Sequence, residues 1–144
     1  RHGCAPGRYD LAAHRARQRD ALWSTARAAP RPADADPAAF PVCIREVPAF
    51  SVAYIRVVDS YRPDGVPAAI ERLRAWAMER GVAGNRWFGY MWDDPMVTAL
   101  PDCRYDVAVE VPPAMRGGGE VGRHDFPAMR VAEVPVRGGV ELEL

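Results

Sequence analysis

Residues 87 to 95, WFGYMWDDP, bring the side chains that could do chemistry closest together, since four aromatic rings are followed by two adjacent aspartates. Two carboxylates can work as a general acid and a general base, but neighbours on an extended chain point to opposite faces. An aspartate before a proline also fits turn chemistry, in which the carboxylate accepts backbone N–H groups. We therefore interpret Asp93 and Asp94 as turn residues and assign no catalytic residue to the chain.

The aromatic side chains of this stretch can belong to a core or to a ligand site. Rings on both faces of a strand cannot all be exposed, so some of them must pack between a helix and a sheet. Others can line a cleft, where flat apolar ligands stack and cations lie over ring faces. Strand alternation places Trp87, Gly89 and Met91 on one face and Phe88, Tyr90 and Trp92 on the other.

The histidines and cysteines indicate neither a metal site nor a cofactor. The cysteines are odd in number and have no CxxC spacing, so we expect reduced thiols. No histidine has a partner at metal-ligand spacing, and we expect His124 to face solvent. No serine lies in a GxSxG context, and no Gly-rich loop opens a helix as phosphate binding requires. The residues concerned are Cys4, Cys43 and Cys103, and His2, His14 and His124.

Length and charge narrow the class of protein. A chain of 144 residues is long enough for one well-packed domain. Nineteen basic and nineteen acidic residues balance, so no overall field attracts nucleic acid or anionic lipid. No segment approaches the roughly 18 apolar residues that cross a bilayer, so we expect a cytoplasmic protein with no membrane partner. The chain starts at Arg1 and stops at Leu144 without a terminating signal, so we expect it to be part of a longer protein.

The N-terminal third divides into a helix and a linker. Residues 8 to 28 are rich in Ala, Leu, Arg and Gln and lack Gly and Pro, which predicts a largely solvated helix. Residues 29 to 41 carry four prolines among small and acidic residues, a composition typical of an extended linker. We therefore place a domain boundary near residue 40.

The remaining chain alternates between strand and helix patterns. Residues 47 to 58 are β-branched and aromatic, and a helix is predicted from Asp64 to its C-cap at Gly81. Further strands are predicted at 86 to 92 and at 104 to 111, the latter with one buried face and one polar face that includes Asp106. After a loop at 112 to 119, GEVGRHDF and MRVAEVPV predict two more strands. This pattern predicts an α+β fold.

An internal repeat adds to this picture. PAFSVAYIRV at 48 to 57 and PAMRVAEVPV at 127 to 136 share Pro, Ala, Val, Ala and a final Val in register, so that Pro48 corresponds to Pro127. The first copy continues into a helix and two strands, whereas the second is cut off soon after its first strand, at the end of the chain. We therefore expect two copies of one unit, with the second incomplete.

Three segments carry a resemblance to a known family. VPAFSVAYIRVVDSY, ERLRAWAMERG and DDPMVTALPDCRYDVAVEVP resemble the effector-binding domain shared by gyrase-inhibitory (GyrI-like) proteins and by the C-terminal halves of AraC-type transcription regulators. RHGCAPGRYD is similar to the close of an AraC-type DNA-binding domain, through Gly3, Pro6 and Tyr9. The resemblance implies three parts: the end of a helix-turn-helix domain at 1–28, a Pro-rich linker at 29–41 and an incomplete GyrI-like domain at 42–144.

The family fold implied by this resemblance is a pseudo-twofold pair of βαββ units with an antiparallel sheet and a ligand cleft between them. Here the second unit would be truncated after its first strand. Drug-sensing relatives hold bulky, often cationic aromatic molecules against aromatic side chains and a glutamate. Carried over to this sequence, Tyr54, Trp92 and Tyr105 are expected near the cleft. Glu133 aligns with Tyr54 in the repeat and would be either a counter-charge for a cation or an exposed strand residue.

The implied function is ligand sensing for an AraC-family regulator, without catalysis. DNA would be contacted through a domain N-terminal to this chain, because the recognition helix would precede Arg1. One alternative is a stand-alone protein that inhibits DNA gyrase or sequesters toxins. A less favoured alternative is a small-molecule hydrolase, for which Glu133 is the one candidate acid. An open sheet edge in the incomplete unit predicts a tendency to form homodimers or aggregates.

Overall fold

The computed structural model describes residue 10, residues 12–13 and 15–17, and residues 42–134. Residues 12–13 and 15–17 are helical, in agreement with the helix predicted at 8 to 28. The predicted linker at 29–41 and most of the predicted DNA-binding remnant lie outside the described residues. The predicted boundary between these two parts therefore stays a prediction. Among the residues described, no helix is long and apolar enough to span a membrane.

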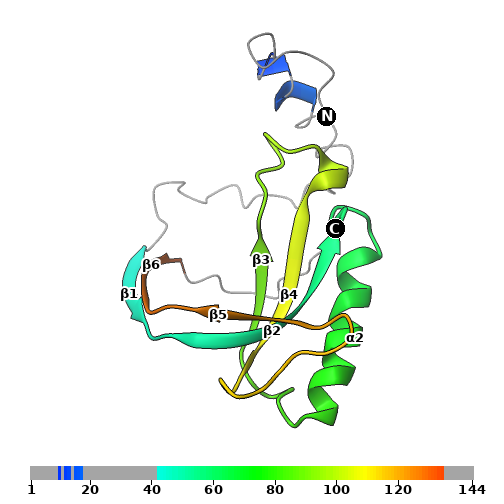
Figure 1. Ribbon diagram of the computed structural model, residues 1–144. Helices are drawn as coiled ribbons and strands as arrows, with labels where there is room; N and C mark the ends of the chain where they lie inside the picture. Colours follow the sequence, from blue (N-terminus) through cyan, green and yellow to red (C-terminus); the bar gives the residue numbers. More distant parts are fainter. Residues whose placement is uncertain (1–9, 11, 14, 18–41, 135–144) are drawn as a thin grey trace, which may run out of the picture.

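The fold is α+β, as predicted, and every pair of strands described is antiparallel (Figure 1). One sheet has four strands in the order β3-β4-β2-β5, and a second ladder pairs β1 with β6. The single long helix described, α2, follows β2. The elements are β1 (Cys43–Val47), β2 (Phe50–Val58), α2 (Gly65–Glu79), β3 (Trp87–Met91), the 3-10 helix η2 (Leu100–Asp102), β4 (Arg104–Val111), β5 (Gly122–Phe126) and β6 (Met129–Glu133).

Helix α2 covers one side of the four-stranded sheet (Figure 1). Its buried residues recur at three- or four-residue spacing and form the core with β2 and β4. Gly81 follows the last turn of α2 with a φ of 69°. This left-handed conformation is the one in which glycine most readily ends a helix. The buried helix residues are Val66, Ala69, Leu73 and Ala77.

The sheet is buried on both sides at its centre. Val107 and Val109 of β4 face the helix and are at most 4% exposed. The prediction of one buried and one polar face for β4 is wrong in the middle of the strand, where Asp106 and Ala108 on the polar face are also buried. The reason is register: large side chains flank Ala108 on both sides, because Phe88 of β3 and Tyr54 of β2 lie opposite it.

The strands confirm the internal repeat. The spacing that carries Pro48 onto Pro127 also carries β1 from Cys43–Val47 onto β5 at Gly122–Phe126, and the start of β2 at Phe50 onto the start of β6 at Met129. β1 pairs with β6, and β2 pairs with β5, in one antiparallel register that is interrupted at the Pro-Ala dipeptides 48–49 and 127–128. The two copies are therefore related by a local pseudo-twofold axis between these dipeptides. The predicted truncation of the second unit concerns residues beyond 134 and stays a prediction.

Candidate functional site

The side of the sheet that faces away from α2 carries a connected group of rings, which we call the aromatic face. Centroids are 5.0 Å apart between Phe50 and Phe126, 5.3 Å between Phe50 and Phe88, and 5.7 Å between Phe88 and Tyr90. Most of these rings are only half-buried, and Trp92 is 43% exposed. A contiguous, partly exposed ring surface of this kind is uncommon on a protein unless it binds something. Its members are Phe50, Phe88, Tyr90, Trp92, His124 and Phe126.

The aromatic face lies on the concave side of a bent sheet. β3 and β5 are the outer strands, with β4 and β2 between them, so a flat sheet would separate their backbones by about 14 Å. Yet the rings of Tyr90 on β3 and Phe126 on β5 are 5.0 Å apart. The two edges must therefore bend toward each other on this side, and the small side chain of Ala108 leaves room for the rings to meet.

A buried carboxylate holds one end of this surface. Asp106 is 2% exposed and accepts hydrogen bonds of 2.8 Å from both Nε and Nη2 of Arg56. Its Oδ2 also accepts a 2.7 Å hydrogen bond from the indole N–H of Trp92. The hydrogen bond to Asp106 is the main cause that raises the pKa of Arg56 above its ordinary value. Hydrogen bonds to a buried, charged group are strong, so this contact fixes the orientation of the Trp92 ring.

Two arginines lie over the rings. The guanidinium of Arg56 is 5.5 Å from the Tyr54 centroid and 5.7 Å from that of Trp92. The guanidinium of Arg86 lies 5.6 Å from Phe50 and 5.5 Å from Phe88, within the range of cation–π attraction. Each arginine also has a carboxylate partner, which for Arg56 is Asp106.

The partner of Arg86 is Glu110. The Arg86 Nε donates a 2.7 Å hydrogen bond to Glu110 Oε2, and this bond lowers the pKa of Glu110 below its usual range. Both of these arginines are thus neutralised locally by a carboxylate.

The ring of Tyr90 contacts the rings of Phe88, Trp92 and Phe126 on the aromatic face and carries a hydroxyl group. This hydroxyl is buried and has no hydrogen-bond partner in the described part of the chain. Burial is the main cause that raises the pKa of Tyr90 to about 12, so the phenol stays protonated at neutral pH. Buried hydroxyls are nearly always hydrogen-bonded, so this group is a donor that lacks an acceptor among the described residues.

The structure brings two of the four predicted ligand residues together. Tyr54 and Trp92 both lie against the Arg56 guanidinium on the aromatic side of the sheet. The Tyr54 ring also lies against Gly122, where a Cβ atom would come within 2.6 Å of it. The role of both residues in binding stays a prediction.

The other two predicted residues lie elsewhere. Tyr105 is on the helix side of the sheet, with its hydroxyl against Gly89, and lines a pocket there. Glu133 ends β6, where its half-exposed carboxylate lies 3.1 Å from Arg45 Nε, so it is an ion-paired residue on the β1–β6 ladder. Arg56 and Asp106 were missed as site residues, because they come together only through the register of β2 with β4.

Comparison with known proteins identifies a family of ligand-binding domains. Residues 40–143 match the family described as the GyrI-like small molecule binding domain. The SPbeta prophage-derived putative transcriptional regulator YosT of Bacillus subtilis is 36% identical over 69 residues, which are 47% of this chain and 46% of that protein. A DNA gyrase inhibitor of Serratia proteamaculans is 36% identical over 70 residues, 49% of this chain and 44% of that protein.

The chain therefore spans about half the length of the curated relatives that it matches. Among solved structures, the C-terminal domain of EcmrR is 14% identical with a TM-score of 0.46, covering 70% of this chain and 65% of that one. The family match extends over far more than half of the chain and includes all the strands described above. The protein belongs to the GyrI-like small-molecule-binding family, as its sequence motifs predicted.

Proposed function

We propose that this chain is the ligand-sensing module of an AraC-family transcription regulator, and that its aromatic face binds a bulky aromatic small molecule. The observation that carries the proposal is the half-exposed ring surface, in which the 43% exposed ring of Trp92 is fixed by the buried carboxylate of Asp106. Membership in a small-molecule-binding family and likeness to a protein named as a putative transcriptional regulator support it. Binding needs no catalytic group, and we propose a non-enzymatic role.

The chemistry of the face suits a flat ligand. A planar molecule stacks against Trp92 and its neighbours and removes their exposed apolar surface from water. An acceptor atom on the ligand would satisfy the buried hydroxyl of Tyr90. Because these rings already hold the guanidinium groups of Arg56 and Arg86 at cation–π distance, a cationic aromatic ligand is the class that we favour.

Regulation would couple this site to DNA through a domain N-terminal to the chain. Ligand binding changes DNA affinity only if the ligand binds one arrangement of the two parts better than the other. We place this regulator in the cytoplasm and expect it to form homodimers. The outer strands β3 and β5 of the sheet offer backbone groups for such pairing.

The test is a titration of the cationic N-methylacridinium and of the neutral acridone with the protein. Binding is measured by the fluorescence anisotropy of each ligand. We expect saturable binding that Trp92→Ala weakens by about fivefold or more, as loss of an aromatic stacking contact predicts. Met91→Ala is the control, because Met91 is an exposed neighbour of Trp92 in the chain but lies on the other side of the sheet. The aromatic face is excluded as the site if the two variants bind equally well.

The charge preference is tested with the same pair of compounds. Glu133→Gln weakens the cation alone if Glu133 is the counter-charge that the sequence predicted. Because Glu133 is half-exposed and paired with Arg45, we expect at most a twofold change, the size expected of a screened surface charge. A larger loss confined to N-methylacridinium would assign the counter-charge to Glu133.

A second candidate function is direct inhibition of DNA gyrase by a stand-alone interaction protein. The observation that favours it is 36% identity over 70 residues to a protein named a DNA gyrase inhibitor. A gyrase supercoiling assay with the purified chain separates the two functions. Inhibition at stoichiometric protein, together with no binding of either acridine, would replace the sensor proposal.

A further inference from the structure

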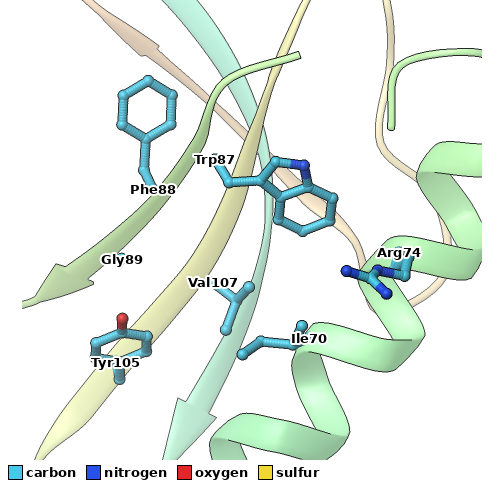
Figure 2. Close-up of a pocket in the computed structure, with 7 residues that line it drawn as sticks. All are labelled: Ile70, Arg74, Trp87, Phe88, Gly89, Tyr105 and Val107. Atoms are coloured by element: carbon cyan, nitrogen blue, oxygen red, sulfur yellow. The ribbon is translucent and has the colours of Figure 1, made fainter. Parts of the chain in front are cut away.

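A hollow lies on the opposite side of the sheet from the aromatic face. Helix α2 packs on β2 and β4 but does not reach over the outer strand β3. The uncovered corner forms an open pocket of about 450 Å³ between the helix and the sheet edge (Figure 2). It is lined by Ile70 and Arg74 of α2, Trp87, Phe88 and Gly89 of β3, and Tyr105 and Val107 of β4.

The pocket has one cation and no acid. The guanidinium of Arg74 points from α2 toward the indole of Trp87 (Figure 2) and makes no hydrogen bond or ion pair with any residue in the described segments. By contrast, Arg72 on the same helix donates its Nε to both carboxylate oxygens of Glu120, at 2.9 and 3.1 Å. No aspartate or glutamate is among the lining residues. An unpaired guanidinium in this setting favours an anion.

A second donor lies on the sheet side of the pocket. The Tyr105 hydroxyl is directed at Gly89 and has no hydrogen-bond partner within the part of the chain that the structure describes. Burial raises the pKa of Tyr105, so the group remains a protonated donor at neutral pH. Gly89 is required here, because a side chain at this position would overlap the hydroxyl.

The apolar sides of the pocket are rigid. Trp87 Nε1 donates a 3.0 Å hydrogen bond to the carbonyl oxygen of Ala83, which fixes the indole while leaving it 37% exposed. Val107 is 4% exposed and belongs to the core, and Ile70 packs against that core. A flat apolar body can therefore enter between the indole and Ile70 without rearranging the fold.

We propose that this pocket is a second ligand site, which takes a small aromatic carboxylate. The carboxylate would pair with Arg74, the ring system would lie between Trp87 and Ile70, and Tyr105 would donate to an oxygen of the ligand. A volume of about 450 Å³ accommodates two or three fused rings. The pocket shares only Phe88 with the aromatic face, where Arg56 and Arg86 already have carboxylate partners.

Isothermal titration calorimetry on the full chain with 2-naphthoate and 2-naphthamide tests the proposal. These probes share a ring system and differ in charge. We expect saturable binding of 2-naphthoate, and we expect Arg74→Gln to weaken it roughly tenfold, the usual effect of losing a charge-assisted hydrogen bond. The amide is expected to bind more weakly and to be insensitive to the same substitution.

Two control variants locate the effect. Arg72→Gln removes the same charge from the same helix outside the pocket, and Trp92→Ala alters the aromatic face, so neither is expected to change 2-naphthoate affinity. The proposal is overturned if Arg74→Gln binds like the unaltered protein, if Trp92→Ala abolishes binding, or if the folded protein shows no saturable binding up to millimolar 2-naphthoate. The acridine titration is a separate measurement, so the failure of this proposal can be distinguished from the failure of the proposed function.

Discussion

The indole N–H of Trp92 donates a 2.7 Å hydrogen bond to Oδ2 of Asp106, a carboxylate that is only 2% exposed. Arg56 binds the same carboxylate through two further hydrogen bonds. An exposed ring is thus tied to the interior of the sheet by a charged group that water does not reach. Such preorganisation reduces the entropy that a ligand-binding ring loses when a ligand stacks on it.

The hydrogen bonds that Asp106 accepts from Arg56 and Trp92 should make a measurable contribution to the free energy of unfolding. Asp106→Asn keeps the shape of the side chain but removes its charge, so Arg56 loses its ion pair and one acceptor becomes a donor. We expect the free energy of unfolding to fall by about 1 to 3 kcal/mol, as for other broken buried hydrogen bonds. Urea denaturation measures it. Glu120→Gln, which breaks the half-exposed pair with Arg72, should cost less than about 1 kcal/mol. Equal losses in the two variants would contradict the role of Asp106.

Gly122 predicts a second effect on stability. A Cβ atom at Gly122 would lie 2.6 Å from the Tyr54 ring, so Gly122→Ala must displace that ring or the strand. We expect a loss of about 1 to 3 kcal/mol, typical of overpacking. Gly118→Ala is the matched control, because nothing lies within 4 Å of its Cβ position. Introduced into a Tyr54→Ala protein, Gly122→Ala should lower the free energy of unfolding much less than it does in the unaltered protein. Equal losses in the two backgrounds would show that the contact with Tyr54 is not the cause.

The sequence predicted α2 and most of the strands because these elements have local patterns. The spacing of Val66, Leu73 and Ala77 on α2, and the helix end at Gly81, follow from periodicity and glycine geometry alone. The strand predicted at 47 to 58 was only partly right. Its residues from Phe50 onward form β2, whereas Val47 ends β1 (Cys43–Val47), a strand that was not predicted and that pairs with a different partner across the Pro48-Ala49 dipeptide.

The site was harder to predict because it depends on register. Alternation within β4 separates Tyr105 from Asp106, but it does not say which of them shares a face with Tyr54 of β2. Pairing places Tyr54 opposite Ala108 and Arg56 opposite Asp106, so Tyr105 falls on the helix side. These contacts join residues far apart in the sequence, such as Arg56 and Asp106, and only the folded sheet defines them.

A third prediction concerns competition for the ring faces. Arg86 lies over Phe50 and Phe88 and is held there by Glu110. Arg86→Gln frees both ring faces and leaves the carboxylate of Glu110 without its partner. We therefore expect N-methylacridinium to bind severalfold more tightly to this variant, in line with a cation–π contribution of about 1 kcal/mol, and acridone affinity to change little.

The control for this prediction is the double variant Arg86→Gln/Glu110→Gln, measured by the same anisotropy titration. It frees the rings but removes the negative charge, so most of the gain in cation affinity should disappear. An unchanged or weaker N-methylacridinium affinity in Arg86→Gln would mean that the cation does not compete for Phe50 and Phe88.

The last prediction uses the titration of Tyr90. Burial raises its pKa to about 12 in the folded protein, from about 10 in an unfolded chain. A raised pKa means that folding favours the protonated phenol. Its contribution to stability is therefore complete below pH 10 and is lost as the pH rises from about 10 to about 12. The free energy of unfolding should decline over this window.

The decline must be separated from that of other tyrosines, such as Tyr61 and Tyr105, whose pKa values burial also raises. Tyr90→Phe isolates the contribution of Tyr90, because it keeps the ring and removes only the hydroxyl. At pH 7 this variant should be as stable as the unaltered protein or more so, since the buried hydroxyl has no partner among the described residues. Above pH 10 its advantage should widen. A Tyr90→Phe protein that is clearly less stable at pH 7 would mean that the hydroxyl already has a partner, and the donor assigned to ligand binding on the aromatic face would be lost.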